Sequence, residues 1–191
     1  MKKIFLSAIL SFGLLNLNAQ LGLRVGGTLA NITNNSSIST ENVFGLNLGV
    51  VYNMGQKALT FKPGVIFTQK GYGVKFGGNT STVNLNYIDI PLNLAYTINN
   101  KLQFEAGPYI GYALSGKVKS GSNSQDLTFS DNGLSRFDGG LNAGVAFYIK
   151  PQIQLGLTYN LGLLDIDNSS SGKITNNYLS LNLVYFLGSK N

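Results

Sequence analysis

The sequence contains no cysteine and no histidine among its 191 residues, and these two absences exclude several kinds of site. Without cysteine the chain can form neither disulfides nor thiolate metal sites. Without histidine it lacks the imidazole that serves as base in Ser–His and Asp–His hydrolases and as ligand in most transition-metal sites. We therefore expect a protein that is not an enzyme and that has no metal and no cofactor.

Charge and proline are also scarce. Charged residues make up 12% of the chain, whereas a soluble domain has roughly 25%. Four prolines against 24 glycines suit strands and turns rather than helices. After the first twenty residues, no segment is apolar enough to span a membrane as a helix. Apolar residues alternate with Asn, Ser, Thr and Gly instead of clustering.

The N-terminus has the pattern of a secretory signal peptide. Lys2 and Lys3 precede a largely apolar stretch to residue 17, and Ala19 supplies the small residue of a cleavage site before Gln20. An N-terminal anchor helix is the alternative, but polar residues and glycine interrupt the stretch, which is shorter than the roughly 20 residues of a span. We expect residues 1–19 to be a signal peptide and residues 20–191 to form one domain.

Eight stretches of the remaining chain alternate apolar and polar residues with a period of two, which indicates β-strands with one apolar face. The clearest has apolar residues at every second position: Ile153, Leu155, Leu157, Tyr159, Leu161 and Leu163. The predicted strands cover residues 21–31, 43–53, 58–70, 83–96, 102–115, 135–148, 153–163 and 178–187. A soluble protein would bury these apolar faces, whereas a membrane barrel turns them toward lipid.

Short and long connections alternate strictly between these strands. The connections at 54–57, 97–101 and 149–151 are short, and those at 32–42, 71–82, 116–134 and 164–176 are long and polar. An even strand number with this alternation is typical of outer-membrane barrels, whose short turns are periplasmic and whose long loops are exterior. The predicted fold is therefore all-β, an eight-stranded antiparallel up-and-down transmembrane β-barrel.

Six ionisable residues fall on the inward-facing positions of the predicted strands, three of each sign. They are Arg24, Lys62, Asp89, Glu105, Arg136 and Asp138. The interior of an eight-stranded barrel is only wide enough for side chains to fill it, and isolated buried charges are costly. We expect an interior charge network that closes the lumen, with a narrow path for ions or solutes as the alternative.

The other charged groups give weaker signals. Asp165 and Asp167 flank Ile166 in a predicted loop, where a solvated turn or a weak divalent-cation site would suit them. The net charge of +6 falls to +4 when Lys2 and Lys3 leave with the signal peptide. The sequence has no basic stripe interleaved with stacking aromatics, so we expect no nucleic-acid partner.

Three segments resemble the PorT-like outer-membrane β-barrel family of Gram-negative bacteria. They are YIDIPLNLAY from residue 87, FEAGPYIGY from residue 104 and RFDGGLNAGVAFY from residue 136. The resemblance spans essentially the whole mature chain and implies a small, porin-like barrel in the outer membrane. Because these motifs are architectural, the resemblance assigns no site residue.

Three functions remain open at this point. The first is a non-enzymatic integral outer-membrane barrel that is structural, adhesive or a component of an envelope complex. Its partners would be outer-membrane lipids and other envelope proteins reached through the exterior loops. The second is a narrow channel for ions or small solutes. The third is a secreted lipocalin-like barrel that binds an apolar ligand, which would require the apolar face to point inward.

Overall fold

The computed structural model describes residues 19–34, 39–55, 58–76, 79–130, 133–168 and 173–187. The predicted signal peptide lies almost entirely outside these residues, so its cleavage stays a prediction. Ala19, the residue before the expected cleavage site, is the first residue of the first strand.

Nine strands form a single sheet. They are β1 (Ala19–Asn34), β2 (Thr40–Met54), β3 (Leu59–Phe76), β4 (Asn79–Ile98), β5 (Leu102–Ser120), β6 (Asn123–Asp126), β7 (Phe137–Lys150), β8 (Ile153–Gly162) and β9 (Ile174–Leu187). All eight predicted strands exist, and six of them run three or more residues further than predicted at an end.

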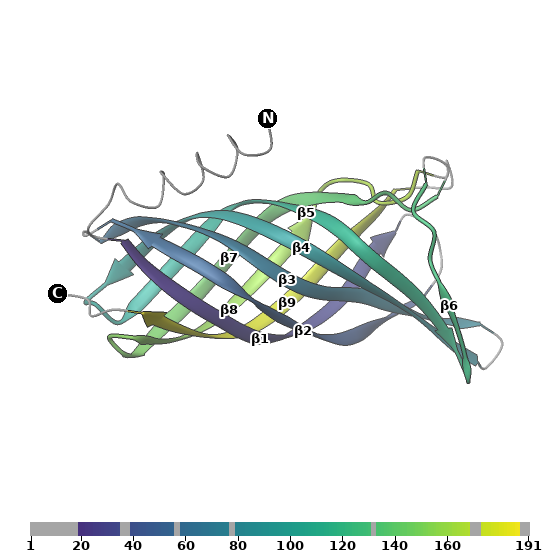
Figure 1. The fold of residues 1–191 in the computed structure, drawn as a ribbon, viewed down its shortest axis with the longest axis horizontal. Coiled ribbons are helices and arrows are strands. Elements are labelled where there is room, and N and C mark those ends of the chain that lie inside the picture. The colour runs from purple at the N-terminus through teal and green to yellow at the C-terminus, as the bar shows by residue number, and fades with distance from the viewer. Residues whose placement is uncertain are drawn as a thin grey trace, which may run out of the picture.

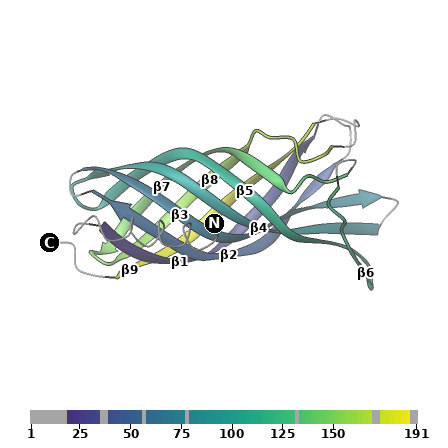
Figure 2. The ribbon, with the colours of Figure 1, turned by 45° about the horizontal axis from the view of Figure 1, so that its top comes forward.

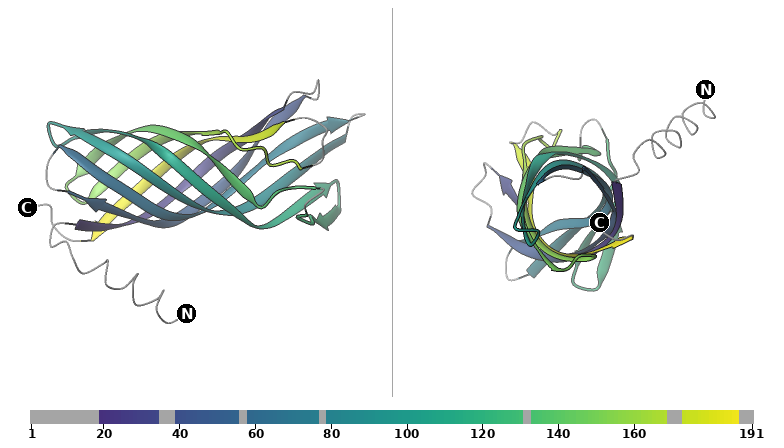
Figure 3. Two further views of the ribbon diagram at one scale, coloured as in Figure 1. Left: turned by 90° about the horizontal axis from the view of Figure 1, so that it is seen from above. Right: turned by 90° about the vertical axis from the view of Figure 1, so that its left-hand side faces the viewer.

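The sheet closes on itself into an antiparallel barrel. Neighbours follow the order β4-β3-β2-β1-β9-β8-β7-β5, and β4 pairs with β5 to complete the ring. Seen along its axis the ribbon forms a closed ring, and seen from the side its strands are strongly tilted (Figure 1, Figure 3). β6 pairs only with β5 and lies outside the ring. The predicted eight-stranded fold is therefore confirmed.

The two faces of the barrel differ in polarity as the alternation predicts. Leu157 on β8 is 41% exposed on the outer surface, whereas its neighbour Thr158 is 4% exposed and faces the lumen. Leu, Ile, Val, Phe and Tyr side chains line the outside of every barrel strand, and Asn, Gln, Thr and charged groups point inward. The lipocalin-like hypothesis is therefore wrong, because the apolar face points away from the interior.

Short turns close one end of the barrel, which we call the turn end. The β4–β5 turn has Asn99 and Asn100 at its centre, both with positive φ of 50° and 55°. The amide of Lys101 donates to the carbonyl of Ile98 at 3.1 Å. Asparagine tolerates this left-handed conformation, which matches the twist of a two-residue hairpin.

The opposite end, which we call the loop end, is more ordered than the sequence predicts. The expected long connection at 71–82 is mostly strand, because β3 and β4 stay paired out to Phe76 and Asn79. The expected loop at 116–134 contains the β5–β6 hairpin, turned at Gly121 with φ of 57°. These hairpins project beyond the ring (Figure 2). Outside the bilayer, backbone pairing continues without an apolar face, so alternation does not mark where these strands end.

The described part of the chain contains no helix that is both long and apolar enough to cross a membrane. Nowhere in the same ranges do three His, Cys, Asp or Glu side chains gather as a metal ion would require.

The outer face gives a direct test of the membrane assignment. Leu157→Arg places a charge on the middle of β8, where it should cost about 2–4 kcal/mol of barrel stability at the bilayer midplane. Leu163→Arg, one residue beyond the loop end of β8, should cost about 0–1 kcal/mol because the group reaches the interface. Urea unfolding of both variants in liposomes measures the difference. Equal costs would show that the barrel does not span a bilayer at this height.

Candidate functional site

Side chains fill the lumen from one end to the other, in layers of different polarity. An apolar cluster lies toward the turn end and consists of Val51, Ile66, Tyr148, Val184 and Phe186. A second cluster lies at the loop end and is built on Val83, Leu85, Tyr87, Ala113 and Ile166. Leu127, Phe129 and Leu134, from the connection between β6 and β7, pack against this second cluster. The interior charges lie against both clusters, since Lys62 Nζ is 6.0 Å from the Phe186 ring centroid and Lys70 Nζ is 4.4 Å from that of Tyr87.

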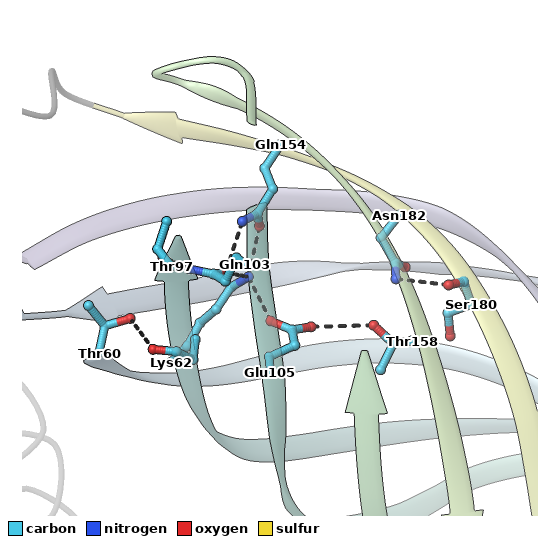
Figure 4. Close-up of polar contacts among 10 residues, drawn as sticks. Thr60, Lys62, Thr97, Gln103, Glu105, Gln154, Thr158, Ser180 and Asn182 are labelled. Atoms are coloured by element: carbon cyan, nitrogen blue, oxygen red, sulfur yellow. Dashed lines mark hydrogen bonds and ion pairs between the residues drawn. The ribbon is translucent and has the colours of Figure 1, made fainter. Parts of the chain in front are cut away.

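Lys62 on β3 organises the polar layer nearest the turn end. Its Nζ lies 2.9 Å from Glu105 Oε2, 3.2 Å from Gln103 Oε1 and 2.8 Å from Gln154 Oε1 (Figure 4). These residues come from β3, β5 and β8, so one ammonium group joins three parts of the wall. An ammonium has three donors, and each finds an acceptor here. We call these four residues the Lys62 cluster.

The acceptors of the Lys62 cluster are themselves held by neighbours. Gln154 donates to Gln103 Oε1 at 2.9 Å, and Gln103 donates to the Thr97 hydroxyl at 2.9 Å. The Thr158 hydroxyl donates to Glu105 Oε1 at 3.3 Å. A buried charge is tolerated when it is paired and its remaining hydrogen-bonding capacity is used, and this layer meets both conditions.

Lys70 organises a second polar layer nearer the loop end. Its Nζ lies 2.8 Å from Asp89 Oδ1 on β4 and 2.8 Å from Asp138 Oδ2 on β7, and the Lys70 side chain is fully buried. Gly111 on β5 lies between the two carboxylates, and a Cβ there would be 2.5 Å from Asp89 Oδ1. The glycine therefore leaves the space in which this pairing fits.

Three tyrosines surround the same ammonium group. The ring centroids of Tyr87, Tyr109 and Tyr178 lie 4.4, 5.1 and 4.9 Å from Lys70 Nζ. The Tyr178 hydroxyl donates to Asp89 at 2.9 Å, and the Tyr109 hydroxyl approaches Asp138 at 3.4 Å. The rings supply cation–π attraction, and two of the three hydroxyls bond the carboxylates, while the Tyr87 hydroxyl accepts from Asn176 at 3.5 Å. We call Lys70, its two aspartates and these tyrosines the Lys70 cluster.

Arg24 on β1 lies between these two clusters. Its Nε lies 3.4 Å from Asn47 Oδ1, and among the described residues no carboxylate comes within salt-bridge distance of it. It borders a cavity of about 10 Å³, shared with Asn93, Asn142 and Asn160, which is room for about one water molecule. Arg24 offsets the excess negative charge of the Lys70 cluster, where one lysine faces two aspartates.

The structure places five of the six predicted interior charges in the lumen, and Arg136 is the exception. Arg136 precedes the first residue of β7 and is half-buried at the loop end. Its Nη1 donates to the carbonyl of Ala113 at 2.8 Å, and its guanidinium lies 4.6 Å from the Phe129 ring centroid. The prediction that Arg136 belongs to an interior network was wrong. Alternate side chains of β7 point into the lumen from Asp138 onward. Arg136 precedes the strand, so the alternation does not determine the direction of its side chain.

Lys70 is the interior charge that sequence reasoning missed. The predicted third strand ended at this residue, and a terminal lysine suits a solvated strand end. The signal was nevertheless present, because Lys70 lies eight positions after Lys62 and therefore on the same face. With Lys70 in place of Arg136, the lumen again holds three positive and three negative groups.

Each of the three interior carboxylates is paired with a lysine ammonium. Asp89 and Glu105 each bind a lysine ammonium and belong to different clusters, so they do not form an acid–base pair. In the loop after β8, Asp165 Oδ1 accepts the amides of Asp167 and Ile174 at 3.0 and 2.9 Å. Asp165 therefore stabilises a turn, which was one of the two predictions for this segment.

Comparisons with known proteins agree with this architecture. Residues 7–168 match the model of a family described as outer membrane protein beta-barrel domain. The chain belongs to this family. The search of curated proteins gave no match.

Two solved structures illustrate the relationship of this outer-membrane barrel to others. Ail, the attachment invasion locus protein of Yersinia pestis, is 15% identical with a TM-score of 0.54, covering 90% of this chain and 100% of Ail. Neisserial surface protein A is 14% identical with a TM-score of 0.57, covering 87% of this chain and 97% of that protein. At these identities the likeness extends to the fold alone.

The Lys70 cluster predicts an asymmetric response to mutation. Lys70→Met leaves two buried carboxylates without a cationic partner, which should lower the free energy of unfolding by about 3–5 kcal/mol. Lys75→Met, on the same strand, removes only an exposed pair with Glu41 and should cost about 0–1 kcal/mol. Urea unfolding in liposomes compares the two variants. A similar small change in both would show that the interior pairing contributes nothing to stability.

Proposed function

We propose that this protein is a non-enzymatic integral barrel of the outer membrane, with a structural or adhesive role or a place in an envelope complex. The observation that carries the proposal is the filled lumen. Two apolar clusters and two lysine-centred clusters occupy the interior, so the outer wall and the loop end remain as working surfaces. Partners of the protein are then outer-membrane lipids around the wall and envelope proteins at the loop end.

The loop-end hairpins support a role in contact rather than transport. The β3–β4 and β5–β6 hairpins are paired strands that project past the ring. All four residues of β6 are exposed, and they are small or polar. Ail has been crystallised with the heparin analogue sucrose octasulfate. In this chain Lys75 and Lys117 are paired with Glu41 and Asp126, so a polyanion is not the partner that the hairpins favour.

Two finer assignments belong to the same proposal. Export by a signal peptide cleaved after Ala19 is supported by the sequence pattern of residues 1–19. Membership of the PorT-like branch is supported by the segments that begin at residues 87, 104 and 136. Those segments form parts of β4, β5 and β7, which are adjacent strands of the barrel.

A narrow channel is the second candidate function. The cavity beside Arg24 favours it, because side-chain amide atoms of Asn47, Asn142 and Asn160 border the lumen there with no hydrogen-bond partner among the described residues. The cavity lies between the two lysine-centred clusters, and a conducting path would have to separate both of them. Each separation would expose a charge that is now paired, so we give the closed barrel preference.

Conductance distinguishes these two functions. The purified protein in planar bilayers should show no steady current, because the lumen has room for about one water molecule between its clusters. As a positive control, Lys70→Ala combined with Asp89→Ala and Asp138→Ala should open part of the interior and increase leakage. Reproducible wild-type currents with defined ion selectivity would contradict the closed barrel and support the channel function.

Orientation can be tested on intact cells. An epitope tag inserted after Gly121, in the β5–β6 turn, should be accessible to antibody because long connections face the exterior. A tag inserted after Asn99, in the β4–β5 turn, should be reached only after the outer membrane is permeabilised. Both variants are first checked for heat-modifiable gel mobility, which shows that they fold. Labelling of the second tag alone would invert the topology.

A further inference from the structure

Arg136 lies on the outer wall of the barrel at the loop end, beside lipid-facing aromatic rings. Tyr112 on β5 and Phe137 on β7 are 44% and 65% exposed on the outer surface. Their ring centroids are 5.3 Å apart in an edge-to-face arrangement, and the Arg136 guanidinium is 5.9 Å from the Tyr112 ring. Aromatic residues at such positions mark the level of the lipid headgroups.

The guanidinium is held in a defined position. Nη1 approaches the carbonyls of Ala113 and Leu114 at 2.8 and 3.4 Å, and the Phe129 ring stacks 4.6 Å away. Nε and Nη2 make no hydrogen bond within the described part of the chain. In the same part of the chain, no carboxylate forms a salt bridge with Arg136. A cation fixed on one side therefore has unused donors on the other.

Those donors border a hollow on the protein surface. The hollow has a volume of about 260 Å³ and lies where β5, the start of β7 and the preceding connection meet. Its polar lining comes from Ser130, Ser135, Asn168 and Arg136, and its apolar lining comes from Tyr112, Phe129 and Phe137. A group that fits must be anionic at one point and must tolerate aromatic rings beside it.

We propose that Arg136 and this hollow bind the phosphate of a lipid headgroup in the leaflet at the loop end. The guanidinium fork matches phosphate geometry, and its hydrogen bonds to phosphate are charge-assisted. The acyl chains of the same lipid would lie along the apolar wall below, beside Tyr112 and Phe137. A lipid is favoured over a free anion because the site opens on the face that contacts the bilayer.

The inference adds a defined lipid contact to the proposed membrane role, and it is independent of whether the lumen conducts. A purely structural role for Arg136 is the competing explanation, because the same contacts join the connection after β6 to the middle of β5, at Ala113. The two differ in one respect. A structural tether stabilises the barrel equally in any lipid, whereas a phosphate site acts only when phosphate is present.

Native mass spectrometry of the full chain in detergent can separate these roles, with bisphosphorylated lipid A as the probe. Wild-type protein should retain one bound lipid, and Arg136→Gln should weaken this binding at least tenfold. Arg136→Lys should lie between them, because it keeps the charge but loses the fork. Lys119→Gln removes another exposed loop-end charge and should leave binding unchanged. Ser130→Trp, which fills the hollow and leaves the arginine intact, should weaken binding as Arg136→Gln does.

Further measurements identify the ligand and distinguish a binding role of Arg136 from a structural one. Lipid A without phosphates should bind wild type and Arg136→Gln equally, and millimolar inorganic phosphate should not displace the lipid. Heat-modifiable mobility confirms that each variant is folded. Equal lipid A binding by wild type and Arg136→Gln would overturn the proposal, as would an equal loss in Lys119→Gln. Displacement by inorganic phosphate would make it a free-anion site, and equal destabilisation of Arg136→Gln with and without lipid phosphate would make it a tether.

Discussion

The constraint on which this structure depends is that a backbone amide in hydrocarbon has no water to bind. Every N–H and C=O of a spanning strand must therefore pair with a neighbouring strand, and no edge can remain within the bilayer. The β4–β5 pairing removes the last edges by closing the ring. Closure with eight strands also fixes the lumen at a width that side chains fill. Alternate side chains of each strand point outward to lipid and inward to the lumen. Because the outward ones must be apolar, the polar residues of the alternating pattern face the lumen.

A filled polar interior then requires balanced charge. Lys62 and Lys70 lie on the same face of β3, and each reaches across the lumen to acceptors on other strands. Because each ammonium joins residues far apart in the sequence, a shift in the register of one strand would leave charges unpaired. The two lysine-centred clusters therefore contribute to the specificity of strand pairing as well as to closing the lumen. In the function that we propose, the wall and the loop end are therefore the working surfaces.

The two ends of the barrel meet different requirements. At the turn end, connections need only reverse the chain, and a pair such as Asn99 and Asn100 is sufficient. At the loop end, hairpins continue beyond the ring, and the connection that carries Phe129 folds back over the mouth. This return places Arg136 against the rings of Phe129 and Tyr112. An arginine that would be costly in the lumen without a carboxylate is stable there, because carbonyls and rings surround part of it and solvent or headgroups reach the rest.

The sequence by itself determined the fold class, the strand number and the face of each side chain, because a period of two is a local property of an extended chain. It also indicated five of the charges in the lumen. The position of a residue such as Arg24 or Glu105 in the two-residue alternation is enough to place its side chain on the inward face. The partners of those charges were decided by the tertiary structure, because strand stagger and closure bring Lys70 to both Asp89 and Asp138. The sequence pattern also did not show where the strands end. Past the bilayer there is no apolar face to mark them, and so Lys70 was overlooked while Arg136 was placed inside.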